Sequence, residues 1–119
     1  MRELAAFYKV LADEARLQML WLLSQVPELC VCDLMTVCAI GQSKASRHLA
    51  ALRAAQLVSD RKGAQWTYYS LRADLGSRQR EQLELVRRWM DERPEAELLR
   101  QRLAERLERK RAEPNCDPA

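Results

Sequence analysis

The sequence predicts a mainly α-helical domain with a small β component, which places it in the α+β class. Apolar side chains recur at helical spacing over most of residues 3–56, and again from residue 78 onward. Between these segments, residues 57–71 are rich in β-prone side chains. With 119 residues, 48% of them hydrophobic and 31% charged, the chain can form one core of modest size.

Two helices are expected near the N-terminus. Apolar residues spaced by three and four positions predict an amphipathic helix over residues 3–12. Asp13 is the expected N-cap of a second helix over residues 14–25, because its carboxylate can accept a hydrogen bond from a first-turn backbone N–H. Pro27 interrupts the chain and permits a new turn to begin near Glu28.

The next elements predict a winged helix-turn-helix. A short helix is expected over residues 30–38, Gly41 interrupts the chain, and Ser43 is the expected N-cap of a helix over residues 43–56. Two helices joined by a short glycine-containing turn are typical of a helix-turn-helix. Two β-prone runs follow around Gly63, which predicts a hairpin. A helix-turn-helix followed directly by a hairpin is a winged helix with a two-stranded β-wing.

The C-terminal third is expected to be helical and charged. Ser77 is the expected N-cap of a helix over residues 78–92, and Pro94 ends it. Residues 95–111 alternate Glu and Arg around leucines, which predicts a solvent-exposed helix with many i, i+4 ion pairs. Residues 112–119 contain two prolines and show no periodicity, so we expect a disordered tail.

Positive charge gathers in the predicted winged helix, although the net charge of the whole chain is only +3. Between Gly41 and Gly63 there are five basic residues and one acidic residue, which give a local charge of +4. Such a patch indicates contact with nucleic-acid phosphates, and side chains near the start of a reading helix also reach base edges. The predicted DNA-contacting residues are Gln42, Ser43, Lys44, Ser46, Arg47, His48, Arg61, Lys62 and Gln65.

Cys30 and Cys32 lie one residue apart at the start of the short helix predicted over residues 30–38. Residues i and i+2 of an ideal helix point about 200° apart, so both sulfurs can bind one atom only if the first turn unwinds. The helix dipole is expected to favour their thiolate forms. Zinc would need four donors and no histidine lies nearby, so the sequence favours a low-coordinate thiolate centre, such as one for trivalent arsenic or antimony.

The segments "ELCVCDL" (residues 28–34) and "SKASRHLAALRAAQLVSDRKGAQWTYYSL" (residues 43–71) resemble the ArsR/SmtB family of metal-responsive repressors, and specifically its arsenic-sensing branch. The similarity extends over about residues 4–90. The resemblance implies a homodimer that binds operator double-stranded DNA and dissociates when As(III) or Sb(III) binds. It also implies that the helices over residues 3–12 and 78–92 form the dimer contacts.

These expectations divide the chain into a DNA-binding and dimerisation domain over residues 1–92, an additional charged helix over residues 93–111, and the tail. Similar proteins often have a third cysteine at the position that Met35 occupies here. Cys38 and Cys116 are therefore further candidate ligands, while two thiolates alone would suit an organic arsenical such as methylarsenite.

Three functions other than a metalloid-responsive repressor are compared with the same sequence features. A thiol redox or sulfane-sulfur sensor of the same fold stays open, although a direct disulfide between Cys30 and Cys32 would be strained. An architectural DNA-binding protein would bind with no response to metalloids. An enzyme is disfavoured, because the chain has no C-x-x-C motif and only three glycines.

The sequence also bears on location and cofactors. Its longest apolar run, around residues 19–23, is too short to span a membrane, and the first residues do not resemble a signal peptide. We therefore expect a cytoplasmic protein with reduced thiols, no membrane partner and no organic cofactor.

Overall fold

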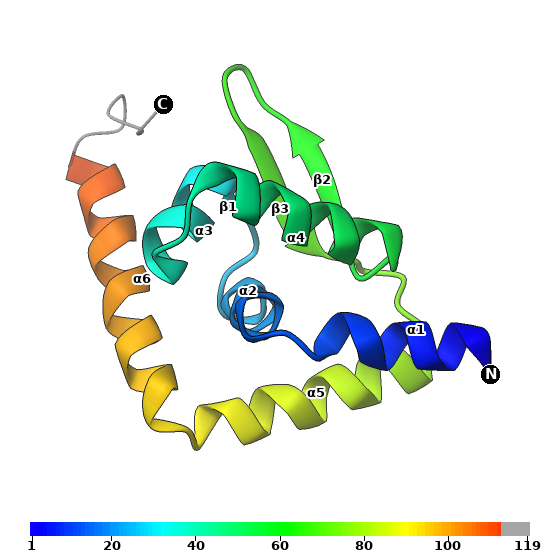
Figure 1. Ribbon diagram of the computed structural model, residues 1–119. Coiled ribbons are helices and arrows are strands. Elements are labelled where there is room, and N and C mark those ends of the chain that lie inside the picture. The colour runs from blue at the N-terminus through cyan, green and yellow to red at the C-terminus, as the bar shows by residue number, and fades with distance from the viewer. Residues whose placement is uncertain (113–119) are drawn as a thin grey trace.

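The computed structural model describes residues 1–112, and within them the chain forms six helices and three strands (Figure 1). In chain order these are α1 (Arg2–Leu11), α2 (Glu14–Gln25), β1 (Leu29–Cys30), α3 (Val31–Cys38), α4 (Gln42–Ala54), β2 (Val58–Lys62), β3 (Thr67–Leu71), α5 (Ser77–Asp91) and α6 (Pro94–Ala112). Most of the predicted tail, including Cys116, lies outside the described residues.

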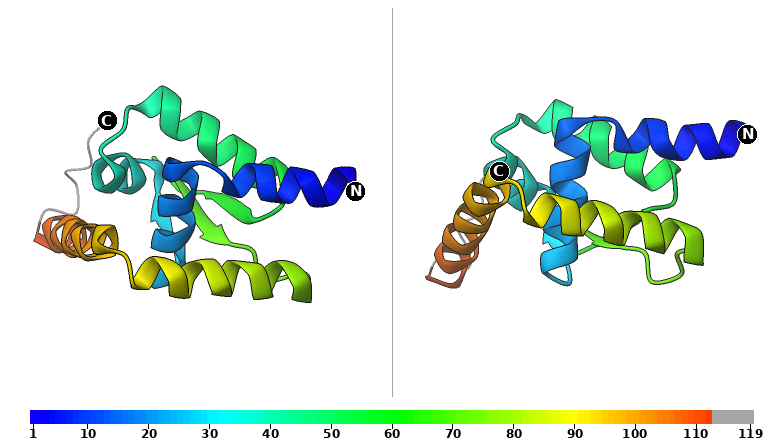
Figure 2. Two further views of the ribbon diagram at one scale, coloured as in Figure 1. Left: turned by 60° about the horizontal axis from the view of Figure 1, so that its bottom comes forward. Right: turned by 90° about the horizontal axis from the view of Figure 1, so that it is seen from below.

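Helix α2 occupies the centre of the molecule, with α4 and α5 on opposite sides of it (Figure 2). Its five successive residues 19–23 are all apolar and buried, which is typical of a helix segment surrounded by other elements. Met19, Trp21 and Leu22 are each at most 1% exposed. Leu34 of α3 and Leu49 of α4 belong to the same buried cluster, so the helix-turn-helix is built directly on α2.

The predicted helix starts are confirmed at one position and wrong at two. Asp13 caps α2, with its Oδ1 accepting a hydrogen bond from the Arg16 backbone N–H at 3.1 Å. Helix α4 begins at Gln42, so Gly41 and not Ser43 is its N-cap, and α5 begins at Ser77 after Gly76. Glycine reaches the extended N-cap conformation at little cost, which allows α4 to begin one residue before Ser43 and α5 to begin at Ser77 itself.

The sheet has one strand more than the sequence predicted. Strands β2 and β3 form the expected antiparallel hairpin, with Lys62 opposite Thr67 near its tip. The two-residue strand β1 pairs with the other edge of β3 and places Cys30 opposite Tyr68, so the strand order is β1-β3-β2. A segment of two residues carries no alternating pattern, which explains why the sequence did not indicate it.

The prediction that the C-terminal helix is solvent-exposed is wrong, because one face of α6 is buried. Ala96, Leu99 and Leu103 are buried and belong to the core cluster, and α6 lies alongside α3 (Figure 1). Most of its charged residues lie on the outer face, while these small and apolar residues are buried together with Arg106. The additional helix is therefore part of the same core as residues 1–92.

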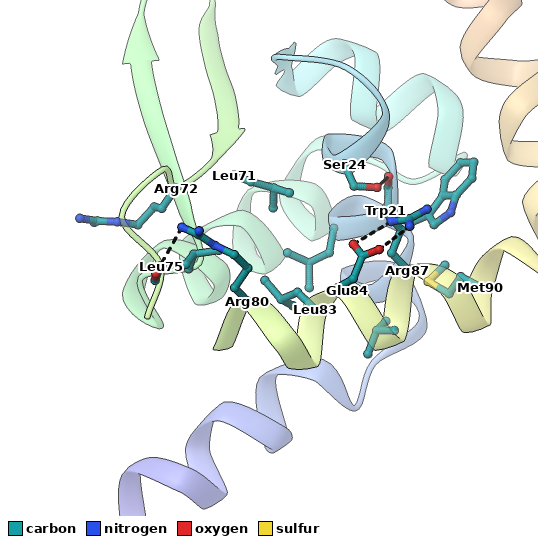
Figure 3. Close-up of a pocket in the computed structure, with 12 residues that line it drawn as sticks. Trp21, Ser24, Leu71, Arg72, Leu75, Arg80, Leu83, Glu84, Arg87 and Met90 are labelled. Carbon is teal, nitrogen blue, oxygen red and sulfur yellow. Dashed lines mark hydrogen bonds and ion pairs between the residues drawn. The ribbon is translucent and has the colours of Figure 1, made fainter. Parts of the chain in front are cut away.

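A hollow of about 220 Å³ separates parts of α2, β3 and α5 (Figure 3). Leu71 and Leu83 line it, and Arg87 pairs with Glu84 at its edge. Beside it, Trp21 Nε1 donates a hydrogen bond to Asp91 at 2.8 Å, which fixes the end of α5 against α2. None of the helices within residues 1–112 combines the length and apolar character that a membrane span needs.

Candidate DNA interface and thiol site

Helix α4 presents a polar face to solvent and an apolar face to the core. Ala45, Leu49 and Leu52 are completely buried, as the helical spacing predicted. The opposite face carries exposed residues that were predicted to contact DNA, namely Gln42, Ser43, Lys44, Ser46 and Arg47. The arrangement supplies hydrogen-bond donors and positive charge on one accessible helix face, which is what base edges and phosphates require.

His48 differs from the other predicted DNA-contacting residues. Its side chain is only 13% exposed and lies between α4 and the start of α2. Its Nδ1 is 3.2 Å from Arg16 Nη1, and its Nε2 is 3.7 Å from Asp13 Oδ1. The imidazole therefore lies between two helices and is less accessible than the other predicted DNA-contacting side chains of α4.

The wing carries its basic residues near the tip. Lys62 and Gln65 are exposed, while Arg61 forms an ion pair with Glu28 and stacks over the Tyr68 ring at 4.6 Å from its centroid. Gly63 permits the tight turn, since a Cβ at that position would lie 2.9 Å from the Tyr68 side chain. Arg61 is thus held along the hairpin, and Lys62 and Gln65 extend beyond it.

The two cysteines flank the start of α3 and do not both lie in its first turn. Cys30 ends β1 with extended backbone angles and is the N-cap of α3, whereas Cys32 lies inside the helix. Both side chains are buried. The sequence placed both cysteines on the helix, whereas the structure has one of the two sulfurs on non-helical backbone.

Asp33 completes the N-terminus of α3. Its Oδ2 accepts a hydrogen bond from the Cys30 backbone N–H at 3.0 Å, and the Cys30 sulfur accepts one from the Asp33 backbone N–H. This reciprocal pair is a capping box in which a thiol replaces the usual hydroxyl. A cysteine followed by aspartate three residues later was the available sequence signal, but cysteine is not among the common N-caps.

Two cations from α6 neutralise the buried Asp33 carboxylate. Arg106 Nε donates to Asp33 Oδ1 at 2.8 Å, and Lys110 Nζ donates to Oδ2 at 3.1 Å. Burial alone would raise the pKa of Asp33, but Arg106, the Cys30 N–H and Lys110 together hold it below its usual range. Asp33 is therefore charged at neutral pH, and it joins α6 to the N-terminus of α3.

The expected thiolate character is contradicted at Cys30. Burial raises the pKa of its thiol, and the hydrogen bond from the Asp33 backbone and the charge of Lys110 do not offset that effect. Burial also raises the pKa of Cys38 to about 11. Both thiols are consequently protonated at neutral pH, because burial outweighs the nearby groups that would lower their pKa values.

The described part of the chain brings no group of three ligating side chains together at the cysteine pair. Within residues 1–112, no three His, Cys, Asp or Glu side chains form a group that could hold a metal ion. Cys38 follows Cys32 by six residues, a rise of about 9 Å along an intact helix. Cys116, the other further candidate, falls beyond the described residues.

The fold and this surface together define a winged helix-turn-helix regulatory protein. Residues 13–60 match the family described as "Bacterial regulatory protein, arsR family". The arsenical resistance operon repressor of Escherichia coli (strain K12) is 53% identical over 64 residues, which cover 54% of this chain and 55% of that protein. The arsenic resistance transcriptional regulator ArsR2 of Pseudomonas putida is 42% identical over 79 residues, which cover 66% and 69%.

Among solved structures, a homodimeric winged helix-turn-helix DNA-binding domain from Mycobacterium bovis, a possible ArsR-family regulator, is 31% identical with a TM-score of 0.63. The match covers 78% of this chain and 82% of that one. The chain belongs to the arsR family of bacterial regulatory proteins. It spans about half the length of the E. coli relative.

Proposed function

We propose that this chain is a homodimeric repressor that binds operator DNA and leaves it when trivalent arsenic or antimony binds Cys30 and Cys32. The position of Cys30 carries the proposal. It ends the strand that pairs with the wing strand β3, and it caps the helix that packs against α4. A ligand at this residue would disturb both DNA-contacting elements at once.

The proposed ligand is supported by the relatives, since the two reported above are named as regulators of arsenic resistance. The two thiols are buried and adjacent to a chain turn, which suits a soft ion held by few ligands. As(III) in water is a neutral hydroxide. Each thiol would displace one hydroxide, forming an As–S bond and releasing water with the thiol proton, so protonated thiols can react without net release of protons.

DNA binding would use α4 in the major groove and the wing on the adjacent backbone. Arg47 would read base edges, and Lys44 and Lys62 would contact phosphates. The exposure of these three side chains supports this assignment. His48 is left out of the reading set, because it already bridges α4 and α2.

Dimerisation would use the apolar surface that α1 and α5 leave exposed. Leu4, Tyr8, Leu85 and Trp89 are exposed apolar side chains of these two helices, and Trp89 is 70% exposed. Tyr8, Leu85 and Trp89 border a groove of about 940 Å³ that continues onto α2 and α6. A second copy is the occupant that the homodimeric Mycobacterium bovis relative supports.

The redox alternative receives less support from the site. Oxidants react with thiolates, and burial raises the pKa of Cys30. A persulfide or peroxide should therefore act slowly on this residue at neutral pH. Arsenite condensation, in contrast, accepts protonated thiols.

The test is the Cys30→Ser/Cys32→Ser double variant. The probe is a duplex selected from a random pool for binding to the wild-type dimer. We expect DNA affinity within about threefold of wild type, because serine keeps the size and capping capacity of cysteine, while release by arsenite is lost. Cys38→Ser is the matched control and should still respond, and fluorescence anisotropy reports both quantities.

Two results would contradict the proposal. Arsenite-driven release that survives in the double variant would place the ligand elsewhere. Release of the wild type by persulfide at concentrations where arsenite has no effect would favour the sulfur-sensing alternative.

A further inference from the structure

Helix α6 packs on the core along its first turns, and near its C-terminal end it lies beside Cys30. We call Cys30, Asp33, Arg106 and Lys110 the Asp33 cluster. In it, Lys110 Nζ lies 3.8 Å from Cys30 Sγ and 3.1 Å from Asp33 Oδ2. Arg106 and Asp33 are both almost completely buried, so their ion pair is shielded from solvent.

The Asp33 cluster also touches the wing. Lys110 lies over the Tyr68 ring at 5.9 Å from its centroid, and Arg61 lies at 4.6 Å from the same centroid. The backbone of Tyr68 pairs with that of Cys30. The end of α6 is therefore in contact with the thiol, with its helix cap and with the wing strand.

Cys30 is the N-cap of α3 and Cys32 lies within the first turn of that helix, so we expect a metalloid that joins their sulfurs to rotate the backbone between them. The Cys30 backbone N–H is bonded to Asp33 Oδ2, and the same oxygen accepts from Lys110. Rotation of residues 30–32 therefore disturbs the acceptor that Lys110 uses. A contact that exists in the free state and is lost in the bound state opposes binding by its full free energy.

We propose that Arg106 and Lys110 are positioning residues that keep the first turn of α3 closed and so set the metalloid concentration at which the thiols respond. This rests on the proposed function, because it takes Cys30 and Cys32 as the ligands. Arg106 fixes Asp33 from the buried side, and Lys110, 23% exposed, closes the cluster from the solvent side. The C-terminal helix thus tunes sensitivity without itself binding DNA.

The experiment uses full-length Lys110→Met, which removes the charge and retains the apolar stem. Arg109→Met is the matched control, since it removes the same charge from an exposed neighbour on α6. Lys110→Arg tests rescue by a conservative change. Arsenite binding to the free protein is followed by sulfur–arsenic absorbance, and amide hydrogen exchange of residues 30–33 is measured without arsenite.

In Lys110→Met we expect faster exchange at residues 30–33 and half-saturation at an arsenite concentration about twofold to tenfold lower than wild type. Arg109→Met and Lys110→Arg should match the wild type. Arg106→Lys, which keeps the charge but loses the Nε donor, should shift half-saturation in the same direction.

An unchanged or higher half-saturation concentration in Lys110→Met, with helical content preserved by circular dichroism, would overturn the proposal. A higher value would mean that Lys110 assists the thiols. Failure of the proposed function has a separate signature, which is arsenite binding retained in Cys30→Ser/Cys32→Ser. The exchange comparison needs no arsenite, so it tests the closing role of Lys110 in either case.

Discussion

Arg47 and His48 are adjacent in the sequence, yet they have different surroundings. Arg47 lies on the exposed face of α4, whereas His48 is turned toward Asp13 and Arg16. Successive residues of a helix point about 100° apart, so neighbouring polar residues can serve two different faces. The difference gives each residue a separate role.

Arg47→Ala should weaken binding to the selected duplex by about 1–3 kcal/mol, because a bidentate contact with a base edge would be lost. Thermal stability should stay near that of the wild type, since the side chain is exposed. Arg88→Ala, an exposed substitution on α5, is the control. Anisotropy titrations against the selected duplex and a scrambled one measure the effect, and an equal loss on both would indicate phosphate contact instead.

At the scale of elements, α6 is the part whose role the sequence left undetermined. Its composition is charged along its whole length, but Leu99 and Leu103 complete the core and Arg106 reaches the buried Asp33. Removing a helix of this kind would expose apolar surface of α3 and leave a buried carboxylate without its cation. The helix therefore contributes to the folding free energy of the whole domain.

Leu103→Ala should lower the free energy of unfolding by about 2–5 kcal/mol, the usual range for a leucine deleted from a core. Leu98→Ala on the same helix is the matched control, because Leu98 is an exposed apolar residue and should have a much smaller effect. Urea unfolding monitored by circular dichroism gives both values. Equal, small effects would show that α6 unfolds independently of the core.

Elements with a strong pattern could be predicted from the sequence, and contacts between distant elements could not. The spacing of apolar residues gave α1 to α5 to within a few residues, and the order of elements gave the winged helix. The strand β1 and the pairing of Asp33 with Arg106 join segments far apart in the chain. No local pattern reports such contacts, and for the same reason the burial that raises the pKa of Cys30 could not be predicted from the sequence.

At the scale of the whole molecule, the proposed DNA-contacting helix α4 and the proposed dimerisation helix α5 lie on opposite sides of α2 (Figure 2). Helix α4 faces one side and α5 the other, so neither surface has to be covered for the other to be used. A dimer built on α1 and α5 would leave both α4 helices accessible. Two copies could then meet successive major grooves on one side of a duplex.

Trp89→Asp should dissociate this dimer, because it places a charge in the middle of the apolar surface. We expect the monomer fraction to rise at least tenfold at micromolar protein in analytical ultracentrifugation, with weaker DNA binding as a result. Leu98→Asp, an exposed apolar position outside the groove, is the control and should remain dimeric. A dimer that persists in Trp89→Asp would move the interface to another surface.

Strand β1 is the shortest element of the fold, and its length determines how strongly it is attached to the sheet. Strand β1 has only two residues, and Cys30 is its last. Each backbone hydrogen bond contributes about 0.5–1.5 kcal/mol net, so the attachment of this strand to its neighbour is weak compared with that of a full-length strand. Under the proposed function, a single atom bound by Cys30 and Cys32 would therefore have to overcome only this weak attachment to separate β1 from β3.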